Sequence, residues 1–342
     1  MRSLPIFAFA LTALAGLVYV NAAPPVVSGN RPVVIEVPVP EADDDPFLTT
    51  PNVRSRRDAV ALQESGAQPA PIDRTKPRSA AAELKLAREQ ILKYNSIQAK
   101  VVETVAIFDR SFKAEGRYLQ TGLRANDWHM RLEIALKVGE SDGSLLEVCD
   151  GDVLWTSTQI DSGKKAPRKE KKDQTVTRRN VTQILAAGRK AGEETEKRLV
   201  TSLGLGGVPA LLAAIEQDMK LTGVKEDTLR DRPVLVIQGT WSDAFASRVF
   251  GQQPQQASVA LPAFVPDTVR VYLDRETGFP LRFLYLKKIP NREVQRAMLT
   301  FDFLDVAINQ PIDPSEFLYD PPSGIQPVEL TNFFLEQLGE KK

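Results

Sequence analysis

The sequence has few of the residues that build metal sites and nucleophilic active sites. Cys149 is the only cysteine and His129 the only histidine among 342 residues. An intramolecular disulfide cannot form, and a histidine-based zinc site or a zinc ribbon cannot be assembled. A catalytic Cys–His pair would require these two residues to meet. Because Cys149 lies in an apolar segment, we interpret it as an inert thiol on a strand, and we expect no metal and no cofactor.

The net charge is zero, because 44 lysines and arginines balance 44 aspartates and glutamates. This balance gives no electrostatic reason to expect nucleic acid as a partner. The one strongly basic run, 162–172, lacks aromatic residues for stacking on bases. We interpret it as a solvated loop, with contact to an anionic membrane surface as the alternative.

Long apolar runs are missing except at the N-terminus. Arg2 precedes an apolar stretch at 4–20, and Val20-Asn21-Ala22 precedes Ala23 in a pattern typical of signal-peptidase cleavage. The pattern predicts a signal peptide over residues 1–22 and a periplasmic mature protein. A retained transmembrane helix is the alternative, since the apolar run of about 17 residues is borderline for a membrane span.

Residues 23–79 are rich in proline, alanine and charge and show little apolar periodicity. Such a composition cannot bury enough surface to offset the entropy of ordering, so we predict a disordered spacer. The three aspartates at 43–45 are interpreted as solvated charges in this spacer rather than as metal ligands. The remaining residues, 80–342, are long enough for one folded domain.

The first half of this domain predicts a helix followed by strands. Leu84, Ala87, Ile91 and Tyr94 recur at helical spacing within 80–96. Period-two alternation then predicts strands at 97–108, 114–121, 129–138, 145–149 and 153–156. Within 129–138, Arg131 and the other charged residues alternate with the apolar ones.

The second half begins with helices and returns to strands. Asn180 is a candidate N-cap for a helix over 180–202, and a glycine-rich break at 203–209 precedes a second helix at 210–218. The break lacks the lysine of a phosphate loop, so we interpret its glycines as a hinge or a close packing site. Strands are predicted at 233–241, 269–273, 281–285 and 299–303, followed by a turn opened by Asp313-Pro314 and a last helix capped by Thr331.

These elements predict an α+β fold: a curved antiparallel sheet, or incomplete β-barrel, with helices covering its concave face. About eight to eleven strands with one apolar face form a sheet that curls. The middle helices must bury their apolar stripe against that face. An apolar cavity results if the space between them is incompletely filled. The sequence does not show whether it is filled.

Several motifs resemble those of one family, the periplasmic outer-membrane lipoprotein carriers of the LolA type. They cover much of residues 82–338: Tyr94-Asn95-Ser96-Ile97 with the preceding helix, Ala114-Glu115-Gly116-Arg117-Tyr118, Asp150-Gly151 followed by Leu154-Trp155, the strand pair at 269–285, Leu299-Thr300-Phe301, and Pro311-Ile312-Asp313 before Phe317 and Pro321-Pro322.

The resemblance implies a non-catalytic periplasmic protein that holds acyl chains of lipoproteins or lipids under a helical lid. It also implies a monomer that exchanges cargo with a membrane-bound donor or acceptor. Arg131 is taken as the counterpart of the lid-contacting arginine of these carriers. The residues expected to contact the acyl chain are Val105, Ile107, Arg131, Leu132, Ile134, Leu136, Trp155, Leu205, Leu211, Leu212, Val271, Leu281, Phe283, Phe301 and Phe303.

Two other functions stay open at this point. A related envelope-sensing domain would recognise lipoprotein or polypeptide and control signalling. A hydrolase acting through carboxylates would need paired acids at strand ends, and none stands out from the surface charges. The identity of the cargo and of the donor and acceptor is not given by the sequence, nor is the role of the spacer.

Overall fold

The computed structural model describes residues 79–107, 110–122, 128–138, 141–161, 173–250, 261, 265–289 and 294–338. The expected signal peptide, the expected spacer up to residue 78 and the basic run 162–172 lie outside the described residues.

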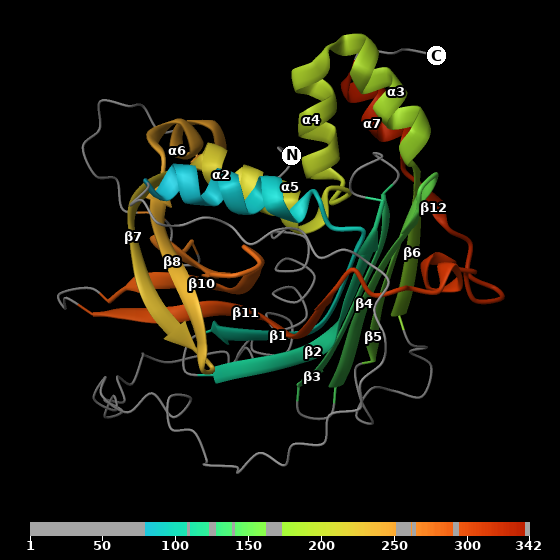
Figure 1. Cartoon of the computed structure of the whole chain (residues 1–342). Coiled ribbons are helices and arrows are strands. Elements are labelled where there is room, and N and C mark those ends of the chain that lie inside the picture. The colour runs from blue at the N-terminus through green and yellow to red at the C-terminus, as the bar shows by residue number, and fades with distance from the viewer. Residues whose placement is uncertain are drawn as a thin grey trace, which may run out of the picture.

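A single curved sheet of 12 strands dominates the molecule, in the order β12-β6-β5-β4-β3-β2-β1-β11-β10-β9-β8-β7 (Figure 1). Its strands are β1 (Ser96–Ile107), β2 (Arg110–Thr121), β3 (His129–Val138), β4 (Ser141–Asp150), β5 (Val153–Asp161), β6 (Asp173–Asn180), β7 (Met219–Leu229), β8 (Arg232–Trp241), β9 (Thr268–Asp274), β10 (Pro280–Lys288), β11 (Gln295–Ile308) and β12 (Val328–Glu329). All neighbours pair antiparallel except β12, which pairs parallel with β6.

Helices α2 and α5 lie across the opening of this sheet, and α3, α4 and α7 stand together beyond the ends of β4 to β6 (Figure 1). They are α2 (Ala80–Ile91), α3 (Val181–Ala191), α4 (Glu193–Ser202), α5 (Gly207–Asp218), α6 (Asp243–Phe250) and α7 (Thr331–Gln337), with a 3-10 turn η1 (Pro314–Phe317). Helices α2 and α5 pack on each other and on β7, whereas α3 packs against α4 and α7. The predicted fold class, an α+β half-barrel with helices over the concave face, is confirmed.

Local sequence signals explain where the helices begin and end. The Ser79 side chain accepts a hydrogen bond from the Ala82 N–H at 3.2 Å, and the predicted cap Asn180 accepts one from the Gln183 N–H at 2.7 Å. The helix expected over 180–202 is in fact two helices, because Gly192 adopts a φ of +122° between α3 and α4. A left-handed residue of this kind ends a helix, and glycine adopts it without steric cost.

Other elements also differ from the sequence prediction. Strands β6, β7 and β12 were not predicted, and neither was α6. In β6 the residues that alternate with Val176 are threonines and Arg179, so hydropathy shows no period-two signal. Thr331 is the first residue of α7 rather than its cap, and its hydroxyl oxygen accepts a hydrogen bond from the Asn180 N–H at 2.7 Å.

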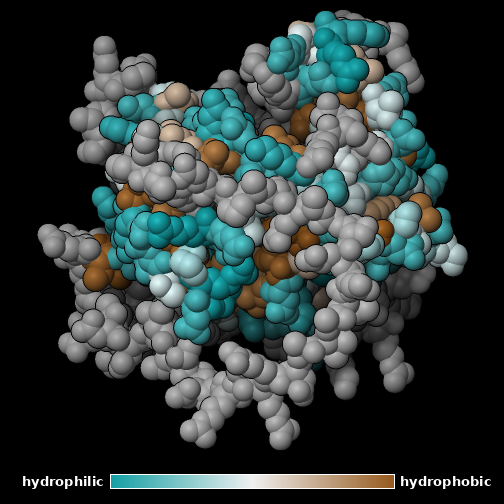
Figure 2. All heavy atoms as spheres, in the orientation of Figure 1, coloured by the Kyte–Doolittle hydropathy of each residue, from teal (hydrophilic) through white to brown (hydrophobic). Residues whose placement is uncertain are grey.

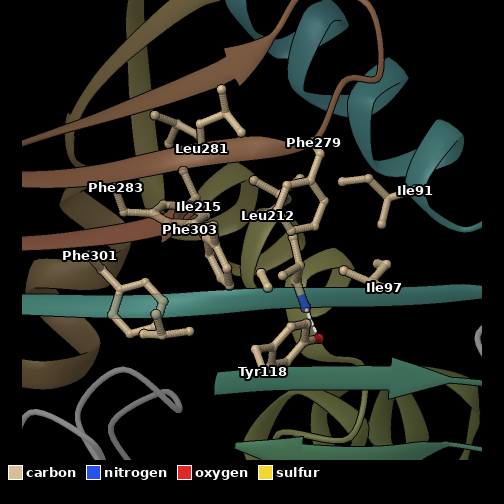
Figure 3. Packing of buried hydrophobic residues seen from close by; sticks show 14 of the residues in the cluster. Ile91, Ile97, Tyr118, Leu212, Ile215, Phe279, Leu281, Phe283, Phe301 and Phe303 are labelled. Atoms are coloured by element: carbon tan, nitrogen blue, oxygen red, sulfur yellow. Dashed lines mark hydrogen bonds between the residues drawn. The ribbon is translucent and has the colours of Figure 1, made fainter. Parts of the chain in front are cut away.

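The sheet has an inner face, which packs against α2 and α5, and an outer face. Side chains alternate between the two along each strand. On the inner face Val101 lies beside Phe303, and Phe283 beside Phe301 and Val271. These residues form one hydrophobic core with Leu84 and Ile91 of α2 and Leu212 and Ile215 of α5, and Figure 3 shows several of them converging. Burial of this shared face fixes the helices on the sheet.

Strand β2 comes unusually close to β3 at Gly116. A Cβ atom on this residue would lie 1.7 Å from the main-chain oxygen of Glu133 on β3. Only glycine fits such an approach, and glycine in a strand commonly marks a place where a sheet bends sharply.

Candidate functional site

Most of the residues expected to contact an acyl chain do lie together. The register places on the inner face Val105, Leu132, Ile134, Leu136, Val271, Leu281, Phe283, Phe301 and Phe303. Leu211 and Leu212 lie on α5, and Leu205 lies in the turn that precedes it. Ile107 ends β1, and its side chain is outside the described part of the structure.

The part of the inner face formed by β1, β10 and β11 is closely packed core. Phe303 lies at the centre of an aromatic cluster, with its ring centroid 5.1 Å from that of Phe301, 5.2 Å from Phe279, 5.7 Å from Tyr118 and 6.4 Å from Phe283 (Figure 3). Edge-to-face contacts of this kind are favourable for aromatic rings. The aromatic residues that were expected to line a cavity therefore pack on one another.

The inner face is more open over β2 to β5. Gly116, Leu132, Glu147 and Thr158 are half-buried there, whereas Val271, Phe283, Phe301 and Phe303 of β9 to β11 are buried. We call this region of the inner face, marked by these four half-buried residues, the open half. Figure 2 shows hydrophobic residues at the surface beside α4 and α5, on a mainly hydrophilic side of the molecule. An elongated apolar ligand could enter here with the least rearrangement, since fewer packed side chains must be displaced.

The start of α5 is fixed to the sheet near this opening. The Val208 N–H donates to the Tyr118 hydroxyl at 3.3 Å, the bond drawn in Figure 3. Gly207 has a φ of +51°, and a Cβ atom there would lie 2.2 Å from the Tyr118 hydroxyl oxygen. The glycines of 203–209 were expected to serve as a hinge or as a close packing site. The contact between Gly207 and Tyr118 shows close packing.

Sequence reasoning missed a polar cluster on the inner face next to the open half. Glu147 lies opposite Leu132 of β3, Thr156 lies opposite Glu147, and Thr177 opposite Thr156. The Arg179 Nη1 donates to the Thr156 hydroxyl at 2.9 Å, and Thr156 in turn hydrogen-bonds Glu147. Burial raises the pKa of Glu147 although Arg179 and Thr156 oppose it, and burial lowers the pKa of Arg179.

A second inner-face carboxyl, Glu103, lies among apolar neighbours. It is 1% exposed, and the residues beside it on the adjoining strands are Phe301 and Ala114. Within the described part of the chain, its Oε2 atom has no hydrogen-bond partner. Burial raises the pKa of Glu103 to about 7. A carboxyl in such surroundings holds its proton because the charged form is poorly solvated.

We expect Glu103 to make stability depend on pH. In the unfolded chain its pKa is near the ordinary 4.5, so between pH 4.5 and about 7 the folded protein holds a proton that the unfolded chain releases. The free energy of unfolding should therefore fall across this window as pH rises, by about 3 kcal/mol in total. Urea unfolding of the wild type and of Glu103→Gln between about pH 4 and 8 measures this difference.

The matched control for this experiment is Glu115→Gln on β2, since the Glu115 side chain is 66% exposed. It should keep the wild-type pH profile, whereas Glu103→Gln should flatten it. Equal slopes for the wild type and Glu103→Gln would show that Glu103 titrates normally in the folded protein.

Arg131 and Trp155 do not join the other expected contact residues, because they point to the outer face. Arg131 donates to the Glu316 main-chain oxygen at 2.9 Å and, through Nε, to Glu133 at 2.7 Å. Trp155 packs against Tyr319, with ring centroids 5.7 Å apart. Both residues hold the segment that follows β11 against the sheet. Arg131 is thus no lid contact.

The outer face carries a charged network around this segment. Arg117 pairs with Glu133 at 2.6 Å and with Glu316 at 2.9 Å. Although burial opposes it, the guanidinium groups of Arg117 and Arg131 lower the pKa of Glu133. A shallow depression of about 290 Å³ lies near the C-terminal end of β3, lined by Ala135, Leu136, Lys137, Asp142, Gly143, Ser144 and Gln159.

Among the residues that the structure describes, no group of three or more histidine, cysteine, aspartate or glutamate side chains could hold a metal ion. No helix in this described part of the chain combines the length and the apolar character needed to cross a membrane.

No protein-family model matches the sequence, and no curated protein does. Solved structures similar to this chain include MucB, at 16% identity and a TM-score of 0.36 over 72% of this chain and 65% of that one, just under two thirds of its length. LprF from Mycobacterium bovis matches at 12% identity and a TM-score of 0.34, over 68% of this chain and 94% of LprF.

A domain named for outer membrane lipoprotein sorting, from Vibrio parahaemolyticus, matches at 8% identity and a TM-score of 0.27, over 69% of this chain and 95% of that domain. At these scores the similarities carry no inference about function. The curved sheet with its helices is the fold that the resemblance to the LolA-type carriers implied.

Proposed function

We propose that this chain is a non-catalytic carrier or binding protein for the acyl chains of lipoproteins or lipids. The observation that carries the proposal is the inner face, which is apolar across most of the sheet, covered by α2 and α5, and half-open at Leu132. The motifs shared with the LolA-type carriers support the same function. The proposal includes export to the periplasm through residues 1–22, action as a monomer, and a membrane-bound donor or acceptor.

The energetics of such binding follow from burial. Each Å² of acyl surface removed from water contributes about 25 cal/mol, so a long chain needs only an apolar groove and no chemical step. In this structure the groove would run from Leu132 along β3 to Ile134 and Leu136, which share the inner face. The start of α5 lies at this end of the groove, because its Val208 N–H bonds the hydroxyl of Tyr118, the cross-strand neighbour of Leu132.

We expect Leu132→Asp to weaken binding of a fluorescent fatty-acid probe at least about tenfold, since it places a carboxylate in the proposed groove. Leu132 is half-buried, so the fold tolerates this change better than a change at the buried Ile134 or Phe283. Fluorescence titration of the full chain measures the affinity, and mass spectrometry of co-purifying lipids identifies the natural ligand.

Ala135→Asp provides the matched control, because Ala135 lies on the same strand but is exposed and points to the outer face. Its probe affinity should stay within about twofold of the wild type. A wild-type chain that binds no probe, or equal affinities for the wild type and a folded Leu132→Asp variant, would refute the proposed function.

A further inference from the structure

The polar cluster of Glu147, Thr156, Thr177 and Arg179 lies on the same face as the proposed acyl groove. Glu147 and Leu132 are direct cross-strand neighbours, so the groove passes from apolar to polar side chains in one step across the sheet. Thr156 and Thr177 continue the same row over β5 and β6. The inner face is thus divided into an apolar part and a polar part that meet at the open half.

This cluster is costly for the fold alone. Arg179 is 7% exposed and Thr156 is 6% exposed, so a guanidinium and its partner are removed from water. The Thr177 hydroxyl oxygen is buried and has no hydrogen-bond partner among the residues that the structure describes. Buried polar groups are normally satisfied, and burying a charged group such as the Arg179 guanidinium rarely stabilises a fold relative to an apolar residue. A ligand that brings polar oxygens would use these groups.

We propose that this cluster binds the polar end of an acylated ligand that carries an anionic oxygen, a carboxylate or a phosphate. The inference rests on the proposed function and adds the orientation of the ligand. Arg179 and the Thr177 hydroxyl donate to the anionic group, and the chain extends from there past Leu132 along β3. Guanidinium groups suit carboxylates and phosphates because they present several N–H donors in one plane. Glu147 competes with the ligand for Arg179.

The test uses three ligands with the same hydrocarbon chain: dodecanoate, dodecyl phosphate and methyl dodecanoate, titrated calorimetrically below their micelle concentrations. Arg179→Gln should weaken binding of the two anions about tenfold and leave the uncharged ester within about twofold. Glu147→Gln should strengthen binding of the anions by a few-fold, because it removes the competing carboxylate. A preference for one anion identifies which of the two chemistries the site takes.

Arg178→Gln is the matched control. Arg178 precedes Arg179 on β6 but points to the outer face, where it pairs with Glu329 at 3.1 Å. It should change none of the three affinities.

The outcomes separate this inference from the proposed function. If the wild type binds none of the ligands, the proposed function fails and this inference with it. If it binds all three and Arg179→Gln alters none, the groove stands and the polar-end assignment is overturned. The assignment is also overturned if Arg179→Gln weakens the ester as much as the anions, since that loss is structural.

Discussion

Replacement of Phe303 by alanine is expected to lower the free energy of unfolding by about 3–5 kcal/mol. Phe303 is 4% exposed, and its ring contacts those of Tyr118, Phe279, Phe283 and Phe301. The substitution removes the transfer free energy of the ring and leaves a cavity that four other large side chains, held on separate elements, cannot fill. Urea unfolding monitored by circular dichroism gives the difference.

Phe333→Ala is the control for this experiment, because Phe333 lies on α7 and is 55% exposed. Its free energy of unfolding should differ from the wild type by no more than about 0.5 kcal/mol. A Phe303→Ala variant as stable as Phe333→Ala would mean that the aromatic cluster is not the centre of the core.

Replacement of Gly116 by alanine should also be severely destabilising, by about 3 kcal/mol or more. The added methyl group would meet the Glu133 main-chain oxygen at 1.7 Å. Backbone atoms of a paired strand cannot move aside as the end of a flexible side chain can. The strands β2 and β3 would have to separate at this point. Thermal unfolding measures the loss.

Gly223→Ala on β7 makes the same chemical change at a place with room, since among the described residues no atom beyond its two chain neighbours lies within 4 Å of its Cβ position. This variant should be as stable as the wild type or slightly more stable, because alanine restricts the unfolded chain more than glycine does. If both substitutions cost the same, the cost at Gly116 reflects strand propensity and not the close approach.

The apolar part of the fold could be predicted from the sequence. Strand β3 was predicted with its observed bounds, and Phe283 and Phe301 were placed on one face because their strands alternate cleanly. Strand β6 escaped prediction because its inner-face residues, Thr177 and Arg179, are polar. The alternation rule assumes that the buried side of a strand is apolar. Where a protein buries a polar cluster, the rule fails, and such places are often functional.

The candidate site could be predicted only in part for a related reason. Period-two alternation in 129–138 already placed Arg131 and Leu132 on opposite faces, but the family resemblance brought Arg131 into the acyl site. The structure follows the alternation, with Arg131 bound to Glu316 on the outer face. How closely Phe303 and its neighbours pack could not be read from a pattern, because packing depends on residues distant in sequence.

The pairing of β1 with β11 has a consequence for the way the chain acquires its structure. Val101 and Phe303 face each other at the middle of the sheet although about 200 residues separate them in sequence. The antiparallel series β1 to β6 can form by local hairpins, but β1 then keeps an open edge beside an apolar face. That edge stays unprotected until the last quarter of the chain has been synthesised. The slow step of folding should therefore be the joining of the two halves, and a chaperone that shields unpaired strands would be most useful in that interval.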